Sequence, residues 1–195
     1  MAEMERIFWE RQREAMSRYT QAEVDFMTGM IGHHAQALIM ADLAEANQAS
    51  SAVRILTSRI INAQNDEIAT MQKWLKDRGE AVPEVHIDGL NLMIHMPDAP
   101  MGEGHAHDHM MPGMLSQAQL EELSVAQGPD FDRLFLTYMI QHHKGAVTMV
   151  DEMFSKDGAG NDEAAFKLAS DIQADQSTEI ARMELMLESM TGSSN

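Results

Sequence analysis

Residues 26–42 read FMTGMIGHHAQALIMAD, and residues 135–151 read FLTYMIQHHKGAVTMVD. The two stretches are identical at nine of 17 positions, including the paired histidines. A second pair of stretches, 56–75 and 168–187, shares the string Q-x-x-E-I-A-x-M. Self-similarity of this kind is the signature of an internal duplication. The chain is therefore predicted to contain one two-helix unit twice.

Both copies of the unit have the sequence signals of helices. Apolar residues recur with the 3.6-residue period of an amphipathic helix. Thr20-x-x-Glu23 forms a capping box before the first helix, and Gly128-Pro129 precedes its copy. An αα-hairpin cannot bury its apolar face alone, so the two hairpins are expected to pack together. The predicted fold is all-α, an antiparallel four-helix bundle.

The expected domain organisation follows from the positions of the repeats. Residues 1–195 form a single helical-bundle domain, with repeat one at 20–79 and repeat two at 128–190. Residues 3–18 are predicted to form an extra N-terminal helix. A long Met/His-rich linker at 80–115 joins the repeats, and a linker of this length is usually functional or disordered.

The composition excludes several classes of protein. The chain has 195 residues with 19 methionines, 9 histidines and no cysteine, which rules out disulfides, zinc fingers, iron–sulfur clusters and thiol nucleophiles. It carries 31 acidic against 14 basic side chains, a net charge of −17, which argues against a nucleic-acid partner. No apolar run is long enough for a transmembrane segment. Thioether and imidazole are the soft ligands that remain.

The duplicated motif M-I-x-H-H-x-x-A-x-x-M offers the first candidate metal ligands. Helical spacing places the methionines and histidines of each copy in one sector of the helix surface. Neutral thioether and imidazole donors suit Cu(I), and by extension Ag(I). The candidates are Met30, His33, His34, Met40, Met139, His142, His143 and Met149, with Met71 and Met183 from the paired helices. Methionines at helical spacing also fill hydrophobic cores, so a purely structural interpretation stays open.

The linker offers the second group of candidates. Residues 91–114 read NLMIHMPDAPMGEGHAHDHMMPGM, with six methionines and four histidines that packing does not explain. An extended chain would point His105, His107 and His109 to one side, as a Cu(II), Zn(II) or Ni(II) site requires. The candidates are His95, Met96, Met101, His105, His107, His109, Met110, Met111 and Met114. The alternative is a His-rich linker with incidental metal affinity.

Sequence motifs of enzymes are missing. The ferritin-like di-iron pattern needs Glu-x-x-His on two helices, and this sequence has none. It also lacks G-x-S-x-G, a P-loop and G-x-G-x-x-G. We therefore expect a binding protein and no catalytic residues.

The motifs together resemble the family called domain of unknown function 305. The resemblance rests on D-F-M-x-x-M-I-x-H-H at 25–34, F-L-x-x-M-I-x-H-H at 135–143, Q-x-x-E-I-x-x-M-x-x-W-L at 64–75 and M-P-G-M at 111–114. It covers about residues 20–190 and implies a ferritin-like bundle, with CopM-like copper-binding proteins among the members. It further implies His/Met copper binding and a role in copper resistance outside the cytoplasm. Met186 departs from the pattern, because it stands where the first repeat has Trp74.

These observations lead to one expected function and three alternative functions. We expect a periplasmic or secreted copper-binding protein, in its mature form, that sequesters or relays Cu(I), with Cu(II) or Ag(I) as further ligands. Copper-export or copper-chaperone proteins are the expected partners. Protonation of histidine below about pH 6 should release the metal. The rivals are a metal-independent helical scaffold, a metal-dependent oxidoreductase such as a cuprous oxidase, and an oxidation sink that uses exposed methionine.

Overall fold

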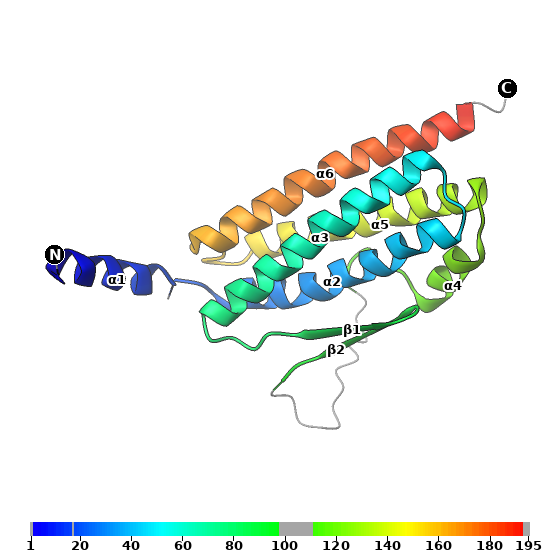
Figure 1. Ribbon diagram of the computed structural model, residues 1–195. Coiled ribbons are helices and arrows are strands. Elements are labelled where there is room, and N and C mark those ends of the chain that lie inside the picture. Colours follow the sequence, from blue (N-terminus) through cyan, green and yellow to red (C-terminus); the bar gives the residue numbers. More distant parts are fainter. Residues whose placement is uncertain (1, 17, 98–110, 193–195) are drawn as a thin grey trace.

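The computed structural model describes residues 2–16, 18–97 and 111–192. These residues form six helices and one two-stranded sheet (Figure 1). The helices are α1 (Ala2–Met16), α2 (Gln21–Ala46), α3 (Ser51–Asp77), α4 (Gln117–Val125), α5 (Pro129–Phe154) and α6 (Glu163–Gly192), and the strands are β1 (Glu84–Asp88) and β2 (Asn91–His95). The prediction of a mostly helical chain is confirmed.

The four long helices lie side by side (Figure 1). Helices α2 and α3 pack against each other, as do α5 and α6, and α2 also packs against α5. The first pair comes from repeat one and the second from repeat two. Helix α1 extends away from the other helices, and α4 lies close to α2 and α5. The two repeats therefore meet mainly along α2 and α5.

The predicted helix starts are confirmed. Glu23 Oε2 accepts a hydrogen bond from the Thr20 backbone at 2.6 Å, which completes the capping box of α2. The other oxygen of Glu23 accepts from the backbone of Gly160 at 3.0 Å, so the start of α2 is tied to the loop between α5 and α6. Helix α5 begins with Pro129 in its first turn.

The all-α prediction is wrong for part of the linker, because residues 84–95 form a β-hairpin. Val85 pairs with Ile94 and Ile87 with Leu92, in an antiparallel register. Alternating apolar residues favour a strand with one covered face, and Gly89 adopts φ +58 at the turn. Ile94 lies against α2, where a Cβ added to Gly32 would be only 2.4 Å from its Cδ1.

The hydrophobic core has two clusters of buried side chains. Phe131, Phe135 and Leu56 belong to one cluster, and Leu75 and Ile172 belong to the other. Both clusters combine residues from the two repeats, so neither repeat buries its apolar face alone. Within the described ranges, no helix is long and apolar enough to cross a membrane.

Trp74 closes one end of the helix assembly. Its indole Nε1 donates to Asp162 Oδ1 at 3.0 Å, and Asp162 also forms an ion pair with Arg78. The Arg78 guanidinium carbon lies 4.2 Å from the centre of the indole ring, a cation–π contact. The tryptophan of the Q-x-x-E-I-x-x-M-x-x-W-L motif therefore joins the end of α3 to the start of α6.

Candidate metal centre

Four histidines meet between the two repeats. His33 and His34 of α2 and His142 and His143 of α5 are all completely buried. The rings of His33 and His142 lie with centroids 3.9 Å apart. We call these four residues the histidine layer. The predicted histidines of the two motifs are therefore brought together by the packing of α2 on α5.

Carboxylates hold the outer pair of imidazoles, those of His34 and His143, in place. His34 Nε2 lies 2.6 Å from Glu67 Oε2, and His143 Nε2 lies 2.7 Å from Glu179 Oε2. A carboxylate only accepts hydrogen bonds, so Nε2 carries the hydrogen in both residues. Nδ1 of both histidines is buried without a hydrogen-bond partner in the described structure. Each carboxylate therefore turns Nδ1 into the atom available to a metal.

The inner pair of imidazoles, those of His33 and His142, is held differently. His33 Nε2 donates to the backbone carbonyl of Pro112 at 3.0 Å, so its Nδ1 is again the free atom. Neither ring nitrogen of His142 has a partner in the described structure. A buried polar atom without a partner costs about 1–3 kcal/mol. Unsatisfied nitrogens in all four rings are expensive for a structural core, and they are suitable ligands for a cation.

Burial keeps the inner pair neutral. Desolvation, followed by the neighbouring His34, lowers the pKa of His33 to about 3. Desolvation, followed by the neighbouring His33, also holds the pKa of His142 well below its ordinary value. Both imidazoles are therefore uncharged at neutral pH, which is the form that binds a metal ion.

The six methionines of the helices that are predicted metal ligands flank the histidine layer in two groups. Met30, Met71 and Met149 are buried in one core cluster, and Met40, Met139 and Met183 are buried in the other. Each group mixes residues from both repeats. On α2 and on α5, the histidines lie between a methionine of one group and a methionine of the other. The arrangement fits both a hydrophobic core and a pair of thioether sites.

The M-P-G-M segment crosses the helices at the histidine layer. Besides the bond from His33 to Pro112, the side-chain amide of Gln36 accepts from the Leu115 backbone at 2.7 Å and donates to its carbonyl at 3.0 Å. A Cβ added to Gly145 of α5 would lie 1.9 Å from the Pro112 oxygen. The segment therefore needs glycine at this point of α5.

Met111 reaches one of the methionine groups. Its sulfur would be 3.4 Å from a Cβ added to Gly29, and the Met149 methyl carbon would be at the same distance. Both side chains therefore meet α2 at one glycine. Met111 and Met114 are partly buried, as is Met96, whereas His95 is exposed on β2. The remaining linker candidates, Met101, His105, His107, His109 and Met110, lie outside the described residues.

Sequence reasoning missed two buried glutamines. Gln64 and Gln176 occupy equivalent positions in the repeats, and their exposed fractions are 1 % and 2 %. Neither the amide nitrogen nor the amide oxygen of Gln64 has a hydrogen-bond partner in the described structure, and the amide oxygen of Gln176 has none either. The signal was present, because both residues belong to the shared string Q-x-x-E-I-A-x-M, one turn before Glu67 and Glu179.

Carboxylates gather where α3 and α6 approach each other. Partial burial, followed by the negative charges of Glu67 and Glu179, raises the pKa of Asp175. Within the described residues, however, no three His, Asp or Glu side chains are arranged to hold a metal ion. A metal in the histidine layer would therefore need imidazole together with thioether ligands.

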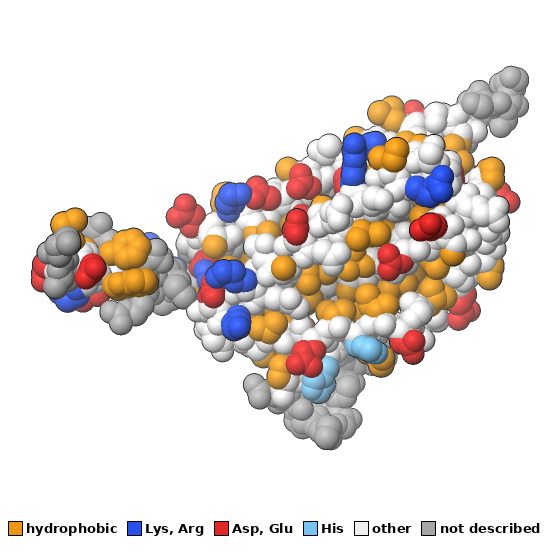
Figure 2. Space-filling model, viewed as in Figure 1, with side chains coloured by type: hydrophobic (Ala, Val, Ile, Leu, Met, Phe, Trp, Pro, Cys, Tyr) orange, Lys and Arg blue, Asp and Glu red, His pale blue; other side chains and the backbone are white. Residues whose placement is uncertain are grey.

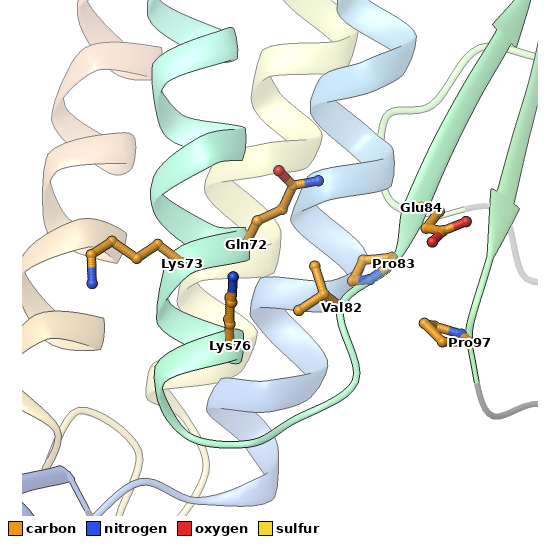
Figure 3. Close-up of a pocket in the computed structure, with 7 residues that line it drawn as sticks. All are labelled: Gln72, Lys73, Lys76, Val82, Pro83, Glu84 and Pro97. Atoms are coloured by element: carbon orange, nitrogen blue, oxygen red, sulfur yellow. The ribbon is translucent and has the colours of Figure 1, made fainter.

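A surface pocket lies apart from these residues. It lies between the end of α3 and the base of the hairpin (Figure 3). Its lining includes two lysines, Lys73 and Lys76, together with Gln72, Val82, Pro83, Glu84 and Pro97. None of the predicted metal ligands lines this pocket. Two nearby ammonium groups would repel a cation, so the histidine layer is the better candidate.

Comparisons with known proteins identify relatives of the whole fold. The sequence model of Domain of unknown function (DUF305) matches residues 23–187. No curated protein matches the chain. A Streptomyces coelicolor DUF305 protein described as secreted is 25 % identical, with a TM-score of 0.67, and the match covers 87 % of this chain and 94 % of that one. A DUF305 fragment from Deinococcus radiodurans is 30 % identical, with the same TM-score, covering 87 % and 97 %.

A third relative has been solved with metal. CopM in its Cu(I)-bound form is 26 % identical, with a TM-score of 0.58, and the match covers 86 % of this chain and 96 % of that one. Solved structures of CopM also include Cu(II)-bound and Ag-bound forms. The chain is thus similar, over most of its length, to a protein that binds these ions.

Proposed function

The chain belongs to the family Domain of unknown function (DUF305), and from this premise we propose that it binds copper and sequesters or relays Cu(I). The histidine layer carries the proposal, because four buried imidazoles with unpartnered nitrogens are costly unless a cation uses them. The relative CopM, with its Cu(I)-, Cu(II)- and Ag-bound forms, supports copper as the ion, with silver as a second soft ligand.

The donor set favours the monovalent state. Imidazole and thioether are neutral and soft, and such ligands prefer Cu(I) to hard divalent cations. The proposed ligands in the helices are Met30, His33, His34, Met40, Met71, Met139, His142, His143, Met149 and Met183. Glu67 and Glu179 would act as positioning residues, since they hold the rings with Nδ1 free.

The linker would collect metal ahead of the helices. Its proposed ligands are His95, Met96, Met101, His105, His107, His109, Met110, Met111 and Met114. Met111 meets α2 beside Met149, so the linker reaches one of the two methionine groups. Because the linker and the helices both offer thioethers, copper would pass from one to the other by exchange between similar ligands.

The proposal extends to the organisation and the setting of the protein. We propose a single domain, a ferritin-like four-helix bundle of α2, α3, α5 and α6, with the repeats at 20–79 and 128–190. It would bind copper without catalysis in the periplasm or outside the cell and contribute to copper resistance, with copper-export or copper-chaperone proteins as partners. The relative described as secreted supports this location.

Equilibrium dialysis against Cu(I) under reducing conditions tests the proposal. The full chain should bind at least one ion, and the double variant His33→Ala with His142→Ala should bind at least one ion fewer than the unmodified protein. Glu184→Gln is the control, because Glu184 forms an exposed ion pair with Lys144 on the surface. Binding of less than one ion per chain, or unchanged binding by the double variant, would contradict the proposal.

A further inference from the structure

The hairpin has two faces of different chemistry. Successive side chains of a strand point to opposite sides, so every second residue shares a face. Val85, Ile87, Leu92 and Ile94 form the apolar face, and Ile94 rests on α2 at Gly32. The opposite face consists of Glu84, His86, Asp88, Asn91, Met93 and His95, and all six are exposed.

The strand register brings the metal-binding side chains of this second face together. His86 lies directly opposite Met93, and His95 lies directly opposite Glu84. Directly opposed Cβ atoms in an antiparallel pair are about 4.5–5.5 Å apart, and diagonal neighbours are about 7–8 Å apart. His86 and His95 are such diagonal neighbours. Two imidazoles, a thioether and a carboxylate therefore share one small patch.

The patch is visible on the surface of the molecule. Figure 2 shows pale-blue histidine side chains at the lower edge of the protein, with acidic side chains in red beside them. In the described part of the chain, the exposed histidines are His86 and His95, because the other four are buried in the histidine layer. Packing does not require this composition, since the opposite face of the hairpin contacts α2.

We propose that His86, His95 and Glu84 form a surface site for Cu(II), with Met93 as a weaker fourth donor. Imidazole and carboxylate are ligands that Cu(II) accepts readily, and a thioether is a common distant ligand of copper. The net charge of −17 raises the local concentration of cations around the protein. The four side chains are exposed, so they can rotate onto one ion, although no such trio converges in the described conformation.

This site is separate from the histidine layer. Ile94, on the inner face of the same strand, lies between the patch and Gly32, the residue before His33. The strand register places these four side chains together whether or not the buried imidazoles bind copper. A surface Cu(II) site and a buried Cu(I) site would give the protein two binding modes for one metal.

The experiment uses the full chain with Cu(II) and no reductant. Dialysis should show that the double variant His86→Gln with His95→Gln binds one Cu(II) ion fewer than the unmodified protein. Electron paramagnetic resonance should show the loss of a signal with nitrogen couplings from two imidazoles. Asn91→Ala, on the same face of the hairpin, is the matched control and should keep that ion. Circular dichroism should be the same for all three proteins.

The outcomes separate this site from the proposed function. His33→Ala with His142→Ala should leave the surface Cu(II) signal in place, and the single variant His86→Gln, which removes no proposed Cu(I) ligand, should keep the Cu(I) stoichiometry of the unmodified protein. Met93→Leu should weaken Cu(II) binding less than the double variant does. If the double variant keeps every Cu(II) ion, or if Asn91→Ala loses the same ion, the hairpin is not a copper site.

Discussion

The imidazole rings of His33 and His142 lie with centroids 3.9 Å apart and planes inclined at 38°. The two residues are the same position of the duplicated motif, once in α2 and once in α5. A residue contacts its own copy where a twofold axis relates the two units, as in a symmetric dimer. An ion bound at this point would therefore receive equivalent ligands from both repeats.

The buried histidines make the stability of the metal-free protein dependent on pH. The folded-state pKa of His33 is about 3, whereas its ordinary value is 6.5, so the unfolded chain binds more protons between these values. The contribution of His33 to the free energy of unfolding is therefore fully present above about pH 6.5. It is lost as the pH falls towards 3, at up to about 1.4 kcal/mol per pH unit. Urea unfolding at pH 7, 6, 5 and 4 measures this slope.

The comparison that isolates His33 is the variant His33→Gln. It lacks the titrating ring, so its unfolding free energy should fall less steeply between pH 6.5 and 4. His86→Gln removes an exposed histidine and should keep the slope of the unmodified protein. Parallel curves for His33→Gln and the unmodified protein would show that His33 is protonated in the folded state over this range.

Burial also changes the expected pH of copper release. An ordinary imidazole would release the metal below about pH 6, which is the pH that the sequence alone predicts. Because the pKa of His33 is about 3, protons compete with the metal at this ring only at lower pH. Copper in the histidine layer should therefore remain bound at pH 5 in dialysis. Release between pH 6 and 5 would indicate that the exposed histidines hold the ion.

The helical part of the fold could be predicted because its signals are local and repeated. The duplicated M-I-x-H-H motif located α2 and α5, and Thr20 at the N-cap of α2 and Pro129 in the first turn of α5 marked their starts. The meeting of His33 with Pro112 could not be predicted, because it joins segments 79 residues apart. The close approach depends on Gly145, whose role appears only when the segment crosses α5.

The hairpin shows how a local signal can be overlooked. Val85, Ile87, Leu92 and Ile94 alternate with His86 and Met93 on either side of a two-residue turn that starts with Gly89, which is a typical hairpin pattern. The unusual Met and His content of residues 91–114 favoured an irregular linker, and that interpretation hid the alternation. The same content includes Met93 and His95, whose shared face becomes clear only from the strand register.

Removing the carboxylates of Glu67 and Glu179 should weaken copper binding without unfolding the protein. Partners of this kind fix the ring tautomer and raise ligand basicity, and their loss typically costs about 10–100-fold in metal affinity. Glu67→Gln with Glu179→Gln keeps the side-chain shape and removes the charge. Competition with a Cu(I) chelator measures the affinity, and nitrogen NMR reports the tautomers of His34 and His143.

The matched control for this prediction is Glu184→Gln, an exposed residue on the same helix as Glu179. It should leave both the affinity and the tautomers unchanged. If the double variant binds Cu(I) as tightly as the unmodified protein, the two glutamates have a structural role only.

Replacing methionine by leucine distinguishes a methionine that binds metal from one that only packs in the core. Met30 and Met139 are completely buried, and leucine of similar volume should cost less than about 1.5 kcal/mol of unfolding free energy at each position. The change removes the thioether. We expect Met30→Leu with Met139→Leu to lower the affinity for Cu(I) and Ag(I) in chelator competition while the fold persists. Equal affinities would assign both methionines to the core.

Gly145→Ala tests whether the M-P-G-M segment supports the histidine layer. The added Cβ would lie 1.9 Å from the Pro112 oxygen, so the segment must move away from α5. Forcing extra volume into a packed contact costs about 1–3 kcal/mol. Movement of Pro112 would also leave His33 Nε2 without its acceptor. We expect a lower Tm and, in chelator competition, a lower affinity for Cu(I).

Gly29→Ala is the stability control for this variant. Gly29 is also a helical glycine, but its added Cβ would meet only the flexible ends of Met111 and Met149, both at 3.4 Å. That distance is ordinary contact, and alanine favours a helix over glycine by up to about 1 kcal/mol. Its Tm should therefore stay level or rise. Since both variants gain the same methyl group, a drop in Tm for Gly145→Ala alone would be due to the clash with Pro112, and equal Tm values would mean that the segment does not rest on α5.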